Sequence, residues 1–92
     1  MNWHFEWDDQ KASDNFRSHG VSFEEAQEAF GDLRGLDEFD AVHSEDETCY
    51  NLIALSSRRL LMVVYAEGVG GGIRLISARR ADGRERKKYE SC

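Results

Sequence analysis

The chain has 92 residues, of which 40% are apolar and 33% charged, and it contains no proline. This length allows one compact domain over residues 1–92 with a modest core and leaves no room for a second domain. The longest apolar run is far shorter than the roughly 20 residues of a membrane span, and the start of the chain lacks a signal-peptide pattern, so we expect a cytoplasmic protein without membrane contact.

The formal net charge of −6 conceals two halves of opposite sign. Residues 1–57 hold three cations and fourteen carboxylates, a balance of −11, whereas residues 58–92 hold nine cations and four carboxylates, a balance of +5. One interpretation is that folding pairs these charges across the surface. The other is a basic working surface for a polyanion, on an acidic body that engages a basic protein.

A strand and a helix are predicted first. Residues 3–7 alternate aromatic and polar side chains, which is typical of a half-buried strand. Asp8 is a suitable N-cap for a helix that runs through about His19, and Gly20 suits the left-handed conformation just past the helix end.

This first helix has two distinct rows of side chains. Ala12 and Phe16 are spaced as a buried stripe. Lys11, Asn15 and His19 follow one another at steps of four and therefore share a different, polar face. That row is either an ordinary solvated face or part of a site.

A second helix is predicted directly after the first. Ser22 is its N-cap, and Glu25 is placed to reach back as the reciprocal partner of a capping box. Phe23 and Phe30 keep the helical period of the buried face, and Gly31 ends the helix.

The remainder of the chain reads mainly as strands. A short acidic edge strand is expected over Leu36–Asp40, followed by a polar loop around His43. Residues 49–56, 60–67 and 73–80 are rich in β-branched and apolar residues and are separated by short turns, so they predict an antiparallel meander in which the last two strands pair.

A helix closes the chain. Asp82 as N-cap and Glu85 three residues later form a variant of the capping box, which predicts a helix over Gly83–Glu90. The expected order is β-α-α-(β)-β-β-β-α. We therefore predict an α+β fold in which an antiparallel sheet packs against two N-terminal helices, with a C-terminal helix following the last strand.

Several kinds of chemistry are disfavoured by spacing. Cys49 and Cys92 form no pattern with the three histidines that would bind a metal, and we expect both thiols to be free. The glycine-rich segment at residues 68–72 lacks the lysine of a phosphate-binding loop. We expect neither a metal nor a cofactor.

The end of the last strand and the helix after it gather side chains that can hold a phosphate and move a proton. Arg79 and Arg80 close the strand, Glu85 and Tyr89 share one face of the helix, and Arg84 and Lys88 share the adjacent face. Arginine suits phosphate because its planar fork donates to two oxygens at once.

Several separated blocks of residues that occur in the order known from one protein family identify a resemblance to that family. The blocks are Phe5-Glu6-Trp7-Asp8, Lys11 with Asn15, residues 19–26 (HGVSFEEA), His43-Ser44, and residues 76–80 (ISARR) with Glu85 and Tyr89. Together they resemble the BrnT toxins of type II toxin–antitoxin systems. The resemblance implies a compact fold like that of the RelE ribonucleases and cleavage of RNA that arrests growth. It also implies neutralisation by a BrnA-type antitoxin whose ribbon-helix-helix region binds operator DNA, so that the toxin meets DNA only through the antitoxin.

The resemblance also implies a set of site residues. The expected catalytic residues are His19, His43, Arg79, Arg80, Glu85 and Tyr89. The expected substrate-binding residues are Lys11 and Asn15 from the matching blocks, together with Arg84 and Lys88, which the helix pattern and not the resemblance supplies. Within the first set, Arg79 and Arg80 would bind the phosphate. His19 or His43 would carry the proton, because histidine titrates near neutral pH, and Tyr89 would stack on a base or donate a hydrogen bond.

The chain departs from the family pattern at two positions. Cys49 stands where the family usually carries an arginine, and Ala54 where it usually carries a glycine. Loss of the arginine removes a cation from the expected site. The alternative function is therefore a catalytically weak or inactive binding module that acts with the antitoxin as a transcriptional co-repressor.

Overall fold

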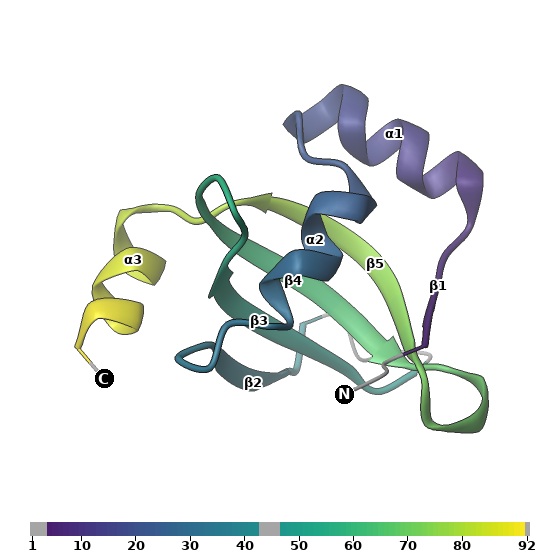
Figure 1. Cartoon of the computed structure of the whole chain (residues 1–92). Coiled ribbons are helices and arrows are strands. Elements are labelled where there is room, and N and C mark those ends of the chain that lie inside the picture. Colours follow the sequence, from purple (N-terminus) through teal and green to yellow (C-terminus); the bar gives the residue numbers. More distant parts are fainter. Residues whose placement is uncertain (1–3, 43–46, 92) are drawn as a thin grey trace.

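The computed structural model describes residues 4–42 and 47–91, and within these ranges the chain forms one five-stranded sheet and three α-helices (Figure 1). The elements in chain order are β1 (Phe5–Glu6), α1 (Asp9–His19), α2 (Phe23–Ala29), β2 (Leu36–Asp40), β3 (Cys49–Leu55), β4 (Leu60–Glu67), the 3-10 turn η1 (Val69–Gly71), β5 (Ile73–Arg80) and α3 (Gly83–Glu90). This order confirms the predicted succession of elements, including the edge strand β2. No helix within the described ranges is long and apolar enough to cross a membrane.

The sheet is mixed rather than antiparallel. Its strand order is β1-β5-β4-β3-β2, and β2 to β5 pair antiparallel as predicted. However, β1 runs parallel to β5, with Phe5 opposite Ile73, so the expectation of a wholly antiparallel sheet is wrong at this edge. Of the predicted strand over residues 3–7, Trp3 lies outside the described residues, and among residues 4–7 the strand covers Phe5–Glu6. Nearly the whole chain separates β1 from β5, so no hairpin turn imposes an antiparallel direction on this pair.

Helices α1 and α2 cover one face of the sheet (Figure 1). Alternate residues of the strands point to this face and pack against the helices. The core formed there contains Val21, Phe23, Ala26, Ala29, Leu52, Ala54, Leu61, Val63, Leu75 and Ala78. The opposite face carries a smaller buried cluster of Cys49, Val64 and Ala66.

The two rows predicted for α1 are each wrong at one residue. Phe16, expected in the buried stripe, is 57% exposed, whereas Asn15, expected on the polar face, is 7% exposed, so the reading of that row as an ordinary solvated face fails at Asn15. The Asn15 side chain donates to the carbonyls of Val21 and Ala78 (2.9 and 2.8 Å) and accepts from the N–H of Ala78 (3.0 Å). Pairing between β1 and β5 has ended before Ala78, so the Asn15 amide satisfies backbone groups at an edge that lacks a strand.

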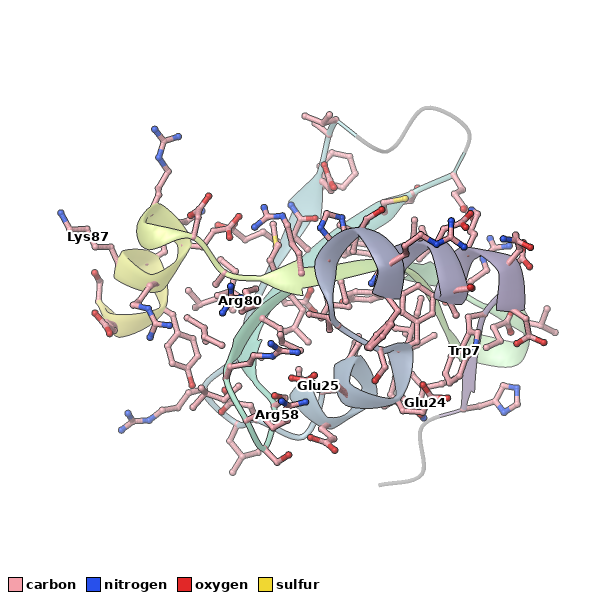
Figure 2. The ribbon with its side chains drawn as sticks, turned by 90° about the horizontal axis from the view of Figure 1, so that it is seen from above. Trp7, Glu24, Glu25, Arg58, Arg80 and Lys87 are labelled. Carbon is pink, nitrogen blue, oxygen red and sulfur yellow. The ribbon has the colours of Figure 1, made fainter. Side chains whose placement is uncertain are left out.

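The predicted capping box of α2 is only half formed. Ser22 caps the helix by accepting from the N–H of Glu25, but the Glu25 carboxylate does not reach back to Ser22. It accepts instead from Arg59 through two contacts of 2.9 and 3.0 Å and from the Ser56 hydroxyl. The hydrogen bond from Arg59 holds the pKa of the Glu25 carboxyl below its usual range. Figure 2 shows Arg58, from the β3–β4 turn, near the same carboxylate.

Further ion pairs join the acidic and basic halves of the chain. Arg74 pairs with Glu47, and Lys88 pairs with Glu38 at 2.8 Å. The first interpretation of the charge asymmetry, pairing of opposite charges across the surface, therefore holds for several second-half cations. Four others have no ion pair in the described part of the chain: Arg80, Arg84, Arg86 and Lys87. Arg80 lies where β5 ends, and Lys87 extends outward from α3 (Figure 2).

Candidate functional site

A pocket of about 370 Å³ opens on the sheet face opposite the core of α1 and α2. We call it the sheet-face pocket. Its lining comes from α1, from the strands β2 to β5 and from Val42, which lies just after β2. The lining residues are His19, Asp40, Val42, Asn51, Met62, Val64, Ser77 and Arg79. The strand period of two explains why Asn51, Val64 and Ser77 share this face while their chain neighbours point to the core.

Arg79 is held in this pocket by a rigid support. Its guanidinium donates to both oxygens of Glu85, at 2.9 and 2.7 Å, and also to the carbonyl of Arg80 at 3.1 Å. The hydrogen bond to Glu85 raises the pKa of Arg79 further. Glu85 in turn accepts from the N–H of Asp82 within the confirmed capping box, which fixes the carboxylate to the start of α3.

The support leaves part of the Arg79 guanidinium available. Arginine carries five N–H groups, and Glu85 and Arg80 engage three of them. The Nε–H and one N–H of Nη2 have no partner in the part of the chain that the structure describes. These two groups lie on the same side of the guanidinium and form a fork that fits two phosphate oxygens.

Asn51 is a site residue that the sequence did not reveal. Its Oδ1 is buried and accepts no hydrogen bond from any described residue, although it lines the sheet-face pocket. An unpaired buried acceptor costs about 1–3 kcal/mol and therefore calls for an explanation such as a missing ligand. An asparagine in the middle of an apolar strand could have signalled this position, because the buried β3 offers few reasons to hold an amide.

His19 connects the sheet-face pocket to a second cavity. This neighbouring pocket, of about 300 Å³, lies along α1 and is lined by Lys11, Asp14, Asn15, Ser18, His19 and Ile76. All three members of the predicted polar row, Lys11, Asn15 and His19, thus line this pocket, and His19 also lines the sheet-face pocket that contains Arg79. Lys11 and His19 are exposed.

Arg80 does not share the pocket with Arg79. Arg79 pairs with Met62, which lines the pocket, whereas Arg80 pairs with Leu61, which belongs to the core on the other face. Consecutive strand residues point to opposite faces, so the two side chains leave the sheet in opposite directions. Of these two arginines, only Arg79 could contact a phosphate bound in the sheet-face pocket.

The other predicted residues of α3 have partners outside the pocket. The Tyr89 hydroxyl donates to Asp32 at 2.6 Å, and this hydrogen bond raises the pKa of Tyr89. Lys88 pairs with Glu38, while Arg84 is exposed without an ion pair among the described residues. His43 falls outside the described residues, so its predicted role stays a prediction.

The comparisons with known proteins decide the family. The sequence matches the family described as "Ribonuclease toxin, BrnT, of type II toxin-antitoxin system" over residues 7–85. The chain belongs to the BrnT family. The fold is similar to the crystal structure of the Brucella abortus ribonuclease toxin BrnT, with a TM-score of 0.62 and 18% identity, over 88% of this chain and 99% of that one. A search of curated proteins gave no match.

The position that departs from the BrnT family pattern lies on the pocket side of the sheet. Cys49 precedes Asn51 by two residues on β3 and is buried with Val64, which also lines the pocket. The thiol forms no disulfide with a described residue and donates to the carbonyl of Glu47 at 3.6 Å, and burial followed by the charges of Glu47 and Asp40 raises its pKa. Cys49 therefore supplies no positive charge in place of an arginine, and its raised pKa disfavours the reactive thiolate.

This BrnT-family pocket combines groups for two tasks. Arg79 can neutralise charge that develops on a phosphate, and the imidazole of His19 can take part in proton transfer. Asn51 adds a hydrogen-bond acceptor for a base or sugar group. Within residues 4–42 and 47–91, no three His, Cys, Asp or Glu side chains are grouped so that they could hold a metal ion.

Proposed function

We propose that the chain is a metal-independent endoribonuclease toxin that cleaves RNA in the sheet-face pocket. The observation that carries this proposal is the convergence of His19, the free fork of Arg79 and the unpaired oxygen of Asn51 on one pocket. These groups match the needs of RNA cleavage by the 2′-hydroxyl. The cleavage arrests translation and growth in the cytoplasm.

The proposed reaction is an in-line attack within the RNA strand. The 2′-oxygen loses its proton and bonds to phosphorus, the bond from phosphorus to the 5′-oxygen breaks, and the 5′-oxygen gains a proton. The products are a 2′,3′-cyclic phosphate and a 5′-hydroxyl. His19 serves in proton transfer, with His43 as its proposed counterpart. Arg79 stabilises the negative charge that builds up on the phosphate oxygens.

Other residues of the proposed site act around this centre. Glu85 positions Arg79, because it holds two of its N–H groups from the start of α3. Lys11, at the far end of the neighbouring pocket, binds a flanking phosphate. Arg80 and Arg84 have no ion pair in the described part and attract the RNA backbone from outside the pocket.

The proposed partner is a BrnA-type antitoxin. A type II toxin implies a protein antitoxin, and the family match supports this partnership. In the proposed complex the antitoxin neutralises the toxin and its ribbon-helix-helix region binds operator DNA. The toxin then has no direct DNA contact of its own.

A specific observation favours a second candidate function. Cys49 occupies the place of a usual family arginine, and burial, followed by the charges of Glu47 and Asp40, raises the pKa of its thiol. With this cation missing, the chain would serve as a weak or inactive toxin that acts with the antitoxin as a co-repressor. This candidate keeps the fold and the partner surface but not the cleavage.

An RNA-cleavage time course in EDTA tests the proposal against this alternative. Wild type is compared with His19→Ala and with His4→Ala, a matched control in which the histidine is exposed and lies before β1. We expect His19→Ala to cut the rate by about 10²–10⁴, the usual contribution of one proton-transfer group, and His4→Ala to retain it. Background traces from all three proteins would reject cleavage and leave the co-repressor.

A further inference from the structure

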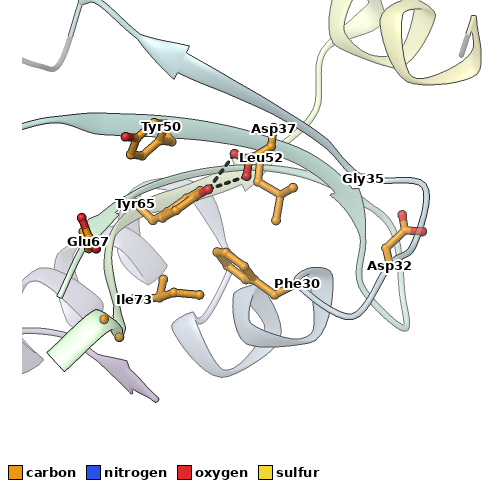
Figure 3. Close-up of a pocket in the computed structure, with 11 residues that line it drawn as sticks. Phe30, Asp32, Gly35, Asp37, Tyr50, Leu52, Tyr65, Glu67 and Ile73 are labelled. Atoms are coloured by element: carbon orange, nitrogen blue, oxygen red, sulfur yellow. Dashed lines mark hydrogen bonds between the residues drawn. The ribbon is translucent and has the colours of Figure 1, made fainter. Parts of the chain in front are cut away.

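A further pocket, seen in close-up in Figure 3, lies on the opposite side of the sheet from the proposed catalytic pocket. Its volume is about 500 Å³, within the range of ligand-binding pockets. We call it the acidic aromatic pocket. Its lining residues are Phe30, Asp32, Gly35, Asp37, Tyr50, Leu52, Tyr65, Glu67, Gly71, Gly72 and Ile73. Tyr50 and Tyr65 are chain neighbours of Asn51 and Val64, so the strand period places the two pockets on opposite faces.

Aromatic rings form the wall of this pocket. Tyr50 and Tyr65 lie with their ring centroids 5.6 Å apart and their planes tilted by 31°. Phe30 and Tyr65 form an edge-to-face pair with their ring centroids 5.1 Å apart. The row continues from Tyr50 to Phe39, whose side chain is 60% exposed. In Figure 3 the Tyr65 ring lies between Tyr50 and Phe30 on the pocket wall. The pocket thus offers tyrosine ring surface beside an exposed apolar residue.

Three carboxylates surround these rings, and the charge of Arg34, which does not line the pocket, contributes to lowering the pKa of one of them, Asp32. Asp32, Asp37 and Glu67 line the pocket, and its lining contains no lysine or arginine. None of the three forms an ion pair with a described residue, in contrast to Glu25 and Glu47 elsewhere on the surface.

Both aspartates are held in place by neutral donors. Asp37 accepts the Tyr65 hydroxyl at 2.6 Å to each oxygen, and burial together with this hydrogen bond raises the pKa of Tyr65. Asp32 accepts from Tyr89 and from the N–H of Leu55. Burial raises the pKa of Asp32, but these hydrogen bonds outweigh it and hold the pKa below its usual range. The Asp32 carboxyl therefore stays ionised at neutral pH.

We propose that the acidic aromatic pocket docks an arginine-bearing, otherwise apolar segment of the antitoxin. A guanidinium stacks on tyrosine faces and donates to carboxylates from the same planar group, so it uses both features of the pocket at once. The apolar neighbours of the arginine would cover Phe39. An RNA strand could stack its bases on the same rings, but three carboxylates in a lining without lysine or arginine repel its phosphates, and the protein partner is therefore favoured.

This inference deepens the proposed antitoxin partnership and rests on it. The docking site lies across the sheet from His19 and Arg79, so removing its charge leaves the catalytic pocket intact. Partner binding and RNA cleavage should therefore respond to different substitutions. A toxin variant that no longer cleaves RNA would still bind the arginine-bearing segment of the antitoxin.

The test uses NMR spectra of the isotope-labelled protein titrated with a short blocked peptide that alternates leucine and arginine. We expect saturable shifts at the amides of Asp37, Tyr65 and Gly72, and their loss when citrulline replaces arginine, because citrulline keeps the shape without the charge. The variant Asp37→Asn with Glu67→Gln should weaken binding by at least about tenfold. A matched pair, Asp9→Asn with Glu24→Gln, removes the same charge from exposed helix positions and should leave binding unchanged.

Several outcomes would overturn the proposal. These are the absence of saturation, equal binding of the citrulline peptide, equal weakening by the matched pair, or shifts of the same amides by a single-stranded RNA. The two variant pairs are then compared for binding to the antitoxin encoded beside the toxin gene, where only the pocket pair should weaken the complex. Neither readout requires cleavage, so an inactive enzyme would refute the proposed reaction without touching this inference.

Discussion

Replacing Asn15 should destabilise the protein rather than impair substrate binding alone. Its side chain makes three hydrogen bonds, to the carbonyls of Val21 and Ala78 and from the N–H of Ala78. Asn15→Ala would leave these three backbone groups without partners, at about 1 kcal/mol or more for each. We therefore expect a loss of roughly 3 kcal/mol in the free energy of unfolding, a large share of the 5–15 kcal/mol that is typical of small domains.

The isosteric change Asn15→Asp sharpens this prediction. A carboxylate can still accept from the N–H of Ala78, but it faces the carbonyls of Val21 and Ala78 without a donor. These contacts raise the pKa of the new carboxyl in the folded state above the unfolded value of about 3.9. A raised folded pKa means that the variant is most stable at low pH and loses stability as the pH rises through the folded pKa.

Urea unfolding followed by circular dichroism measures both variants. Asp14→Ala is the matched control, because the adjacent residue is exposed and should change stability by less than about 0.5 kcal/mol. RNA cleavage is measured in parallel and corrected for the folded fraction. If Asn15→Ala stays as stable as the control while RNA cleavage is lost, Asn15 is a substrate-binding residue, and its proposed role in stabilising the fold is refuted.

Three further predictions concern charge. Glu25→Gln should lower the stability at neutral pH, and its difference from wild type should vanish as the pH falls through the lowered pKa of Glu25; equal unfolding curves at pH 7 would contradict this. Cys49→Arg should raise RNA cleavage, because it returns a cation to the pocket side of the sheet, and unchanged rates in a folded variant would refute this. Association with the antitoxin should slow as salt increases, because attraction to the −11 half is screened over about 10 Å at 0.1 M salt; stopped-flow rates that stay flat would contradict it.

Local signals in the sequence identified most elements because they act over a few residues. Asp82 and Glu85 form the predicted capping box, and Gly20 adopts the predicted left-handed conformation at the end of α1. The alternating strands from 60 to 80 pair as expected. Each of these features depends on spacings of two to four residues, which a single sequence displays directly.

Contacts between distant residues could not be predicted in this way. Asn15 is buried because β1 ends before Ala78, and Glu25 leaves its helix cap because Arg59 lies within reach after folding. The same limit applies to the site: the sequence placed Arg79 and Arg80 together, but only the strand register shows that they face opposite sides. Asn51 was missed because its unpaired oxygen becomes visible only once its neighbours are in place.

The comparison of Arg79→Ala with Arg80→Ala tests the central claim most directly. Both changes remove one positive charge from the end of β5, but only Arg79 lines the sheet-face pocket. In an RNA-cleavage time course with EDTA, we predict that Arg79→Ala reduces the rate by about 10²–10³, as does the loss of one preorganised donor, and that Arg80→Ala stays within about tenfold of wild type. Equal losses from the two variants, or a larger loss from Arg80→Ala, would contradict the assignment of catalysis to this pocket.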